Sequence, residues 1–220
     1  MRGFEARGED AVATLDDEER LVVARIVADV AGLLGADAFG SSHEDFRNSG
    51  ETDVDDPFEH LRGLEESIRE PSDPAILRLL PNAAPTDREV SDEFRRLTDG
   101  ELRAIKTRRL RRIWDQLSNS SGGTDSDAWV VPADEALSTA AALTDIRLVL
   151  ASRLGLVTDD DADRLHHEID LAARALDADD EFALPVDHER VWLGMLYQAL
   201  TWLQESLVEF VSGTQEETDV

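Results

Sequence analysis

The 220-residue chain contains no cysteine. This absence excludes disulfide bonds, thiol nucleophiles, iron–sulfur clusters, zinc fingers built on thiolates and any thiol-based redox switch. The sequence also lacks a phosphate-binding loop, a Rossmann glycine pattern and a nucleophile elbow. Acidic residues are so numerous that no carboxylate pair stands out as a general acid and base. We therefore expect no catalytic site and no cofactor.

Long apolar runs are absent as well. None approaches the roughly 18 residues that a membrane-spanning helix needs, and residues 1–5 have no apolar segment of the kind found in signal peptides. Apolar residues make up 41% and charged residues 32% of the chain, a balance typical of a folded and highly soluble protein. We expect a cytoplasmic protein with a single domain over residues 1–212.

Basic residues are scarce, but they gather in one segment. The formal net charge is −27, and the chain has only one lysine. Residues 102–114 nevertheless contain no acidic residue and six basic ones: Arg103, Lys106, Arg108, Arg109, Arg111 and Arg112. On a helix, Arg108, Arg111 and Arg112 fall outside the apolar arc, whereas Lys106 falls inside it.

Something negative is expected to lie against this basic segment, and three interpretations remain open. The cations could form ion pairs with the chain's own acids while their aliphatic stems cover apolar surface. They could instead meet an acidic patch on a protein partner. Direct nucleic-acid binding is the least favoured, because a charge of −27 repels nucleic acid beyond a Debye length of about 8 Å.

A second charged group lies in the predicted helix 133–154. Arg147 and Arg153 fall on the same face as its apolar residues, where an unpaired charge is costly. Asp145 or Glu205 could pair with them. The sequence therefore predicts buried ion pairs within the set Asp145, Arg147, Arg153 and Glu205.

Metal-binding signals are weak. His166 and His167 are adjacent, so their side chains diverge by about 100° on a helix and cannot easily face one ion. The acidic run 159–163 resembles the start of a calcium loop but lacks the turn glycine, since Arg164 stands in that place. We expect no metal site.

Hydrophobic periodicity predicts a mainly α-helical, bundle-like domain with a small β element. Residues 2–15 are typical of a β-hairpin, and residues 129–131 predict a third short strand beside it. Segments 36–57 and 118–127 are expected to be mobile loops, and residues 213–220 a disordered tail. Helices are predicted over 16–35, 58–68, 74–80, 86–117, 133–154, 161–176 and 188–212.

Capping signals mark several helix ends. Asp16 and Glu19 have the spacing of a capping box at the start of the first helix, and Gly35 is the expected stop. Asp73 precedes Pro74, a combination that favours a helix start at the proline.

The predicted helix 86–117 is expected to kink or break in its middle. Thr86 and Glu89 form a capping box at its start, and residues 98–101 form a second one around a glycine. The apolar residues of 102–117 are offset by roughly a quarter turn or more, at about 100° per residue, from an earlier apolar stripe of Val90, Phe94 and Leu97.

The last predicted helix, 188–212, is apolar over most of its circumference. Such a helix lies in the centre of a protein or at an interface, which leaves a homodimer possible. Trp192 and Trp202 lie on it, and like the other two tryptophans they fit core packing better than stacking on a ligand.

Three segments carry a resemblance to a known family: EFRRLT at 93–98 followed by Leu102-Arg103 and Lys106, LTDIRLVL at 143–150 followed by RLG at 153–155, and LTWLQESL at 200–207. In order and spacing they resemble the actinobacterial AosR-like oxidative stress regulators, a family long described as a domain of unknown function. The resemblance implies a cytoplasmic transcriptional regulator that acts through a protein partner, a sigma factor or RNA polymerase, and through a cysteine-pair switch. The switch cannot be carried over, because this chain has no cysteine.

These observations predict a non-enzymatic regulatory or interaction protein whose contact surface includes Arg108, Arg111 and Arg112. Two alternatives remain open. One is an enzyme whose site is assembled from scattered carboxylates and arginines. The other is a structural homo-oligomer joined through residues 188–212.

Overall fold

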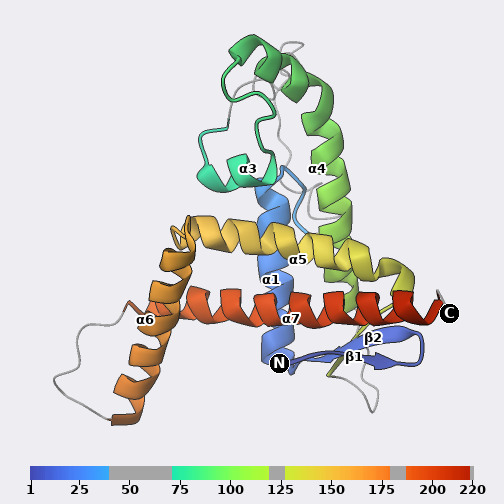
Figure 1. The fold of residues 1–220 in the computed structure, drawn as a ribbon, viewed down its shortest axis with the longest axis vertical. Helices are drawn as coiled ribbons and strands as arrows, with labels where there is room; N and C mark the ends of the chain where they lie inside the picture. Colours follow the sequence, from blue (N-terminus) through green and yellow to red (C-terminus); the bar gives the residue numbers. More distant parts are fainter. Residues whose placement is uncertain (40–70, 119–126, 179–186, 219–220) are drawn as a thin grey trace, which may run out of the picture.

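The computed structural model describes four stretches of the chain: residues 1–39, 71–118, 127–178 and 187–218. These stretches contain six helices and a three-stranded antiparallel sheet, which confirms the predicted mainly α-helical class with a small β element. α1 (Asp17–Leu33) packs on α4 (Arg88–Ser118), and α5 (Ala133–Arg153) packs on α7 (His188–Thr218). Figure 1 shows the two pairs crossing each other, with the sheet beneath α7.

The sheet assembles from both halves of the chain. β1 (Arg2–Arg7) and β2 (Asp10–Thr14) form the predicted hairpin, and Gly8 takes a φ of 67° in its turn. β3 (Ala128–Val131) pairs antiparallel with β2, which confirms the third strand and gives the order β1-β2-β3. The sheet therefore ties the N-terminal hairpin to the segment between α4 and α5.

The hydrophobic core fills the space between the crossed helix pairs and the sheet. Trp129 on β3 is fully buried, and its ring meets that of Phe4 on β1 edge to face at 5.1 Å. Its Nε1 donates to Oε1 of Gln116 on α4 (2.9 Å), and Gln116 in turn donates to Glu135 on α5 (2.8 Å). One side chain thus joins the sheet to two helices.

Local capping signals predicted several helix ends correctly. Asp16 accepts the backbone N–H of Glu19 (2.8 Å), and Glu19 accepts that of Asp16 (3.0 Å), so the capping box of α1 is confirmed. Gly35 follows the end of this helix with a φ of 83°, in the left-handed region that glycine favours. α3 (Pro74–Leu79) begins directly after Asp73, whose carboxylate accepts a backbone N–H at 2.8 Å.

Of the kink or break predicted at residues 98–101, the break is excluded, because α4 is one continuous helix, and a bend is what the structure shows (Figure 1). Figure 1 shows the helix curving in its N-terminal half rather than ending. The hydroxyl of Thr98, expected to cap a second helix, instead donates to the carbonyl of Phe94 (2.9 Å). This type of contact bends a helix without breaking it.

One face of α4 explains this continuity. Residues at a spacing of three and four are buried or half-buried along its whole length: Ser91, Arg95, Asp99, Leu102, Lys106, Leu110, Ile113 and Leu117. The face is polar in its first half and apolar in its second. The kink or break was predicted from the offset between two apolar stripes, whereas the buried face continues along the helix through polar residues as well as apolar ones.

Two other boundaries differ from prediction. Asp87 rather than Thr86 caps α4, since its carboxylate accepts the backbone N–H of Val90 at 3.2 Å. α7 continues to Thr218, so the tail predicted to be disordered from residue 213 is helical as far as that residue. An internal glycine costs a helix only about 1 kcal/mol relative to alanine, too little to force an end at Gly213.

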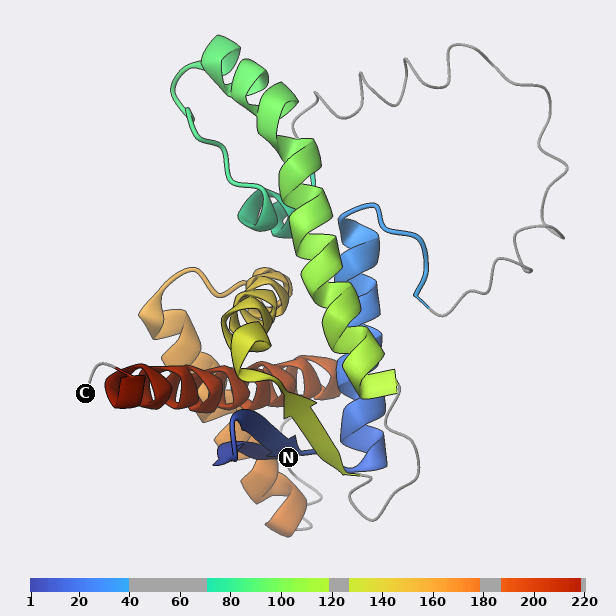
Figure 2. The same ribbon diagram turned by 90° about the vertical axis from the view of Figure 1, so that its right-hand side faces the viewer.

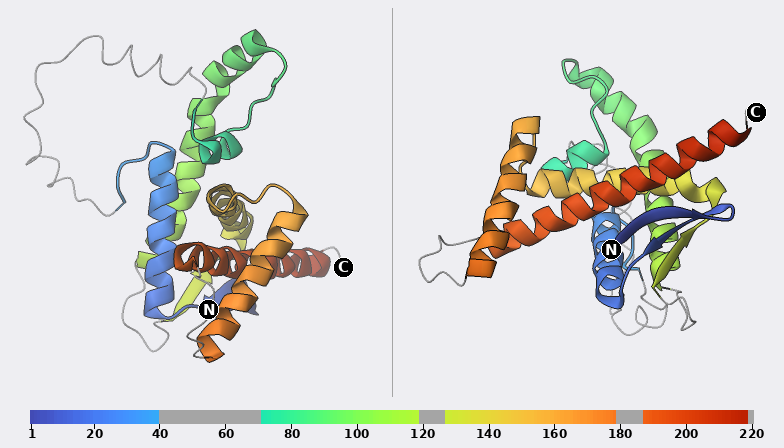
Figure 3. Two further views of the ribbon diagram at one scale, coloured as in Figure 1. Left: turned by 90° about the vertical axis from the view of Figure 1, so that its left-hand side faces the viewer. Right: turned by 60° about the horizontal axis from the view of Figure 1, so that its bottom comes forward.

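The remaining helix, α6 (Asp159–Ala178), confirms the helix predicted near 161–176. Figures 2 and 3 show it lying across one end of α5 and α7, while α1 and α4 run side by side. The predicted helix 58–68 and most of the predicted loops 36–57 and 118–127 lie outside the described residues. None of the helices in the described stretches combines the length and apolarity required to cross a bilayer.

Candidate functional site

The basic segment 102–114 lies in the C-terminal half of α4, where four of its six cations have intramolecular contacts. Arg103 donates through Nη1 to the carbonyl of Leu34 at the end of α1 (3.2 Å). Arg112 forms an ion pair with Glu135 of α5, in which Nε donates to Oε2 at 2.9 Å. These contacts hold α4 against its neighbours.

Arg111 stacks on aromatic rings and pairs with no acid among the residues that the structure describes. Its guanidinium carbon lies 4.1 Å from the centre of the Phe39 ring and 5.8 Å from that of Trp114, a cation–π arrangement. Arg108 and Arg109 have no intramolecular partner among the residues that the structure describes. The structure therefore favours the first interpretation, pairing within the chain, for most of the segment, and it leaves two adjacent guanidiniums available.

Lys106 and Asp145 form an ion pair between α4 and α5. The side chain of Asp145 is 4% exposed and that of Lys106 is 17% exposed. One carboxylate oxygen of Asp145 contacts Lys106 Nζ, and the other is buried with no hydrogen-bond partner in the described stretches of the chain. Asp145 is thus a buried ion-pair residue as predicted, but its partner comes from the basic segment and not from the arginines of its own helix.

Arg147 contacts neither of its two predicted partners, Asp145 and Glu205. Its Nη1 donates to Oε1 of Gln204 on α7 (2.6 Å), and its guanidinium lies 5.4 Å from the ring of Tyr197. Glu205, the next residue after Gln204 on α7, is exposed, since consecutive side chains on a helix diverge by about 100°. The expected acid–base pair is replaced by a neutral amide and an aromatic face.

Arg153 pairs with Asp73, the capping residue of α3. The contact is bidentate, with distances of 2.7 and 3.0 Å, and it lies at the surface rather than in the predicted buried position. The hydrogen bond from Arg153 holds the pKa of Asp73 below its ordinary value. The pair fastens α3 to the C-terminal end of α5.

This lowered pKa gives a test by acidification. A carboxyl whose pKa is lower in the folded state stabilises the protein above its unfolded pKa of about 3.9, and the stabilisation is lost as the pH falls through the folded value. Replacing Arg153 with glutamine is expected to lower the melting temperature at pH 7, with a difference from wild type that shrinks steadily below about pH 4. Differential scanning calorimetry between pH 7 and pH 3 measures it. A difference that stays constant over this range would mean that the pair is not formed.

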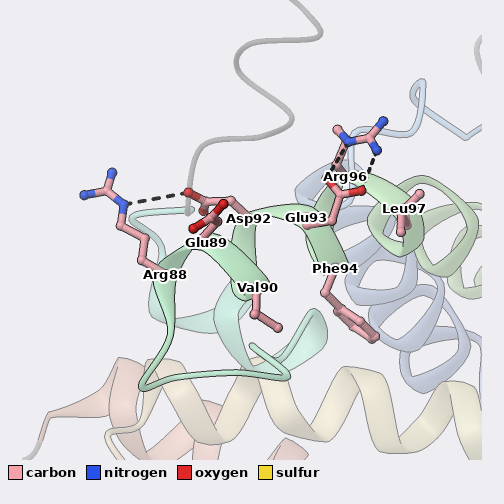
Figure 4. Close-up of a pocket in the computed structure, with 8 residues that line it drawn as sticks. All are labelled: Arg88, Glu89, Val90, Asp92, Glu93, Phe94, Arg96 and Leu97. Atoms are coloured by element: carbon pink, nitrogen blue, oxygen red, sulfur yellow. Dashed lines mark hydrogen bonds and ion pairs between the residues drawn. The ribbon is translucent and has the colours of Figure 1, made fainter.

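An exposed apolar row lies on the N-terminal half of α4. Val90, Phe94 and Leu97 are spaced i, i+4 and i+7, so they share one face, and they are 54%, 41% and 64% exposed. They line a surface hollow of about 980 Å³. Figure 4 shows Val90 and Phe94 projecting from the same side of the helix. Apolar side chains that are grouped on a surface, rather than scattered singly, are a feature of interaction sites.

The charges beside this apolar row are mostly paired with one another. Arg88 lies 3.7 Å from Asp92, and Arg96 donates to Glu93 at 2.6 Å. The Arg96 hydrogen bond lowers the pKa of Glu93, which keeps this carboxylate ionised. Glu89 is the carboxylate in excess, so the rim of the hollow is weakly acidic.

The polar face of α4 opposite the apolar row determines which side of the helix is exposed to solvent. The hydroxyl of Ser91 donates to Oδ1 of Asn82 at 2.7 Å, and Arg95 and Asp99 are buried on the same face. Burial raises the pKa of Asp99, opposed by the positive charges of Arg95 and Arg103. Turning the apolar row inward would expose these groups and break the Ser91 hydrogen bond, so the row stays exposed.

Comparison with known proteins places the chain in a family. Residues 1–211 match the family described as a domain of unknown function, DUF2017. The chain belongs to the DUF2017 family. No curated protein and no solved structure matches it.

Two exposed features of this DUF2017 protein were not predicted from the sequence. Val90, Phe94 and Leu97 were placed on one apolar stripe, but their exposure was not foreseen. The signal that could have indicated it is the set of polar residues on the other face of the same helix: Ser91, Arg95 and Asp99. Trp192 and Trp202 were expected in the core, whereas they are 49% and 47% exposed on α7.

Metal ligands are not assembled in the described part of this DUF2017 protein. No group of three His, Asp or Glu residues there is arranged to hold an ion. His166 lies 2.9 Å from Gln198 of α7, and Asp161 accepts hydrogen bonds at the N-terminus of α6. Both residues belong to segments with weak metal-binding signals in the sequence, and in the structure they form hydrogen bonds within the chain.

Proposed function

We propose that this protein is a non-enzymatic regulatory protein that acts by binding a protein partner through the apolar row Val90, Phe94 and Leu97. The exposure of this row on a helix whose other face is fixed by polar contacts is the observation that carries the proposal. The arginines of the basic segment contribute less than the sequence suggested, because most of them are occupied within the chain.

The occupant that fits the row is an amphipathic helix with basic flanks. Apolar anchors at i, i+4 and i+7 are the pattern by which helices pack on one another at interfaces. The rim of the hollow has one carboxylate in excess, and the whole chain carries a charge of −27. Basic residues beside the apolar face of the partner would therefore be attracted both by the excess carboxylate at the rim and by the negative net charge of the whole chain.

The resemblance to AosR-like regulators suggests a class of partner. It favours a component of the transcription machinery, a sigma factor or RNA polymerase, as the protein that supplies this helix. Any response to oxidants would have to come from that partner or from another source, since the chain has no cysteine.

The test combines crosslinking with a direct affinity measurement. A photo-crosslinking amino acid at Val90 should trap one protein from the host lysate, whereas the same amino acid at Leu137, which is 64% exposed on α5, should not. The trapped protein is then purified and titrated by isothermal calorimetry. Substituting serine for both Phe94 and Leu97 is expected to weaken binding by at least about tenfold, because each apolar side chain buried at an interface contributes about 1.5–3 kcal/mol.

The matched control is Leu137→Ser, an equally polar change at an exposed leucine outside the row. It should leave the affinity and the melting temperature unchanged. Unchanged affinity after the double substitution at Phe94 and Leu97 would contradict the proposal. Recovery of only a second copy of the chain would also contradict it, and would favour a homodimer joined through the apolar row that carries the crosslinker.

A further inference from the structure

A second cavity lies where α3, α4 and α5 meet, away from the apolar row. Its volume is about 440 Å³, within the range of about 300–1,000 Å³ that is usual for small-molecule sites. α3 contributes Arg78, α4 contributes Lys106 and Arg109, and α5 contributes Asp145. Four charged side chains from three helices therefore converge on one open cavity.

The cavity is positively charged in a strongly acidic protein. Three cations face one carboxylate, and that carboxylate, Asp145, is already bound to Lys106. Two positive charges remain in excess, whereas the chain as a whole carries −27. Concave surfaces focus the field of the charges that line them, so a small anion is attracted here even though the rest of the surface repels it.

The cations retain unused hydrogen-bond donors. Arg109 is half-buried and has no intramolecular partner in the described stretches. Arg78 donates through Nη2 to the carbonyl of Leu156 (2.6 Å), which fixes the side chain but uses only one of its five N–H groups. Lys106 gives one of its three protons to Asp145. A partly desolvated guanidinium without an anion is unfavourable, and a ligand oxyanion would relieve this cost.

Apart from Thr144, the rest of the cavity wall is apolar. Leu79 is fully buried, and Leu102 and Leu148 are half-buried beside it. An inorganic anion would contact the cations but leave these leucines in water. A ligand with a hydrocarbon portion satisfies both parts of the wall.

We propose that this cavity binds a small organic oxyanion, with its carboxylate or phosphate group at Arg109 and Lys106 and its hydrocarbon portion against Leu102 and Leu148. The site does not depend on the partner-binding surface, because none of the residues of the apolar row lines it. The ligand oxyanion would also supply the negative group that we expected to lie against the basic segment 102–114.

Octanoate and octyl phosphate are suitable probes, with octanamide as the uncharged comparison and inorganic phosphate as the comparison without hydrocarbon. Isothermal titration calorimetry on the full chain at low salt is expected to give binding of both octyl anions. Octanamide and inorganic phosphate should each bind at least about tenfold more weakly, since each lacks one of the two contacts. The carboxylate and the phosphate ester together show which head group the cations prefer.

Arg108 supplies a matched control for Arg109. The two residues are adjacent, both lack an intramolecular partner in the described chain, and Arg109 alone of the pair lines the cavity. Arg109→Gln should weaken octanoate binding by about tenfold or more, whereas Arg108→Gln, with the same change in net charge, should not alter it. Arg109→Lys, which keeps the charge, should retain most of the affinity, and this variant covers the case in which Arg109→Gln does not fold.

Three results would overturn the proposal. The first is an absence of binding by either octyl anion at millimolar concentration. The second is an equal loss of binding in Arg108→Gln and Arg109→Gln, which would indicate general charge attraction. The third is equally tight binding of octanamide. The double serine variant at Phe94 and Leu97 should bind octanoate normally, which separates this site from the proposed function.

Discussion

Replacing Lys106 with methionine is expected to lower the free energy of unfolding by about 3 kcal/mol at neutral pH, near the lower end of the range for breaking a buried ion pair. The substitution removes the one side chain that hydrogen-bonds to the carboxylate of Asp145 among the described residues, and this carboxylate belongs to a side chain that is only 4% exposed. The carboxylate would then be buried without compensation. The loss in the free energy of unfolding is expected near the lower end of the range because Lys106 is 17% exposed, so the ion pair has some access to solvent.

Replacing both partners provides the control. In the double variant Lys106→Met with Asp145→Leu, no charge is buried, and its stability is expected to lie within about 1 kcal/mol of wild type or above it. Urea unfolding of the wild type, both single variants and the double variant measures the complete cycle. If the Lys106→Met variant were as stable as the double variant, Asp145 would have to be solvated in the folded protein, contrary to the structure.

The second large effect is expected at Trp129. Replacing it with alanine should cost about 3–5 kcal/mol, the range for removing a large aromatic side chain from a core. The change leaves a cavity between the sheet and two helices, removes the edge-to-face contact with Phe4, and deprives Gln116 of a donor. Urea unfolding followed by circular dichroism gives the loss directly.

Two variants make the Trp129 result specific. Trp129→Phe keeps an aromatic ring next to Phe4 but loses the indole N–H, so its cost should be smaller than that of alanine. Trp192→Ala removes a tryptophan that is 49% exposed, and it should change the stability by less than about 0.5 kcal/mol. Similar losses for Trp129→Ala and Trp192→Ala would contradict the burial assigned to these two side chains.

Features encoded by neighbouring residues could be predicted from the sequence. The capping box of Asp16 and Glu19, the proline start after Asp73 and the glycine stop at residue 35 each involve groups within a few positions of one another. The third strand was also predictable, because residues 129–131 are a short β-prone run next to a turn. Such signals act before any tertiary contact is formed.

The course of α4 could not be predicted in the same way. Periodicity identifies a face but assumes that the apolar face is the buried one. In this helix Ser91, Arg95 and Asp99 are buried while Val90 and Phe94 are exposed. The continuous buried face becomes evident only once its packing partners are known.

The sequence by itself determined the mainly helical class, most helix boundaries, the surplus of negative charge and the absence of thiol chemistry, since each follows from composition or from contacts within one element. Only the tertiary structure decided that Lys106 pairs with Asp145 and that Arg109 lines a cavity without a partner among the described residues. It also decided that Arg147 meets Gln204 rather than Glu205. The physical reason is geometric: an ion pair needs two groups within a few ångströms, and a turn of about 100° between successive helix residues determines which of them a distant helix can reach.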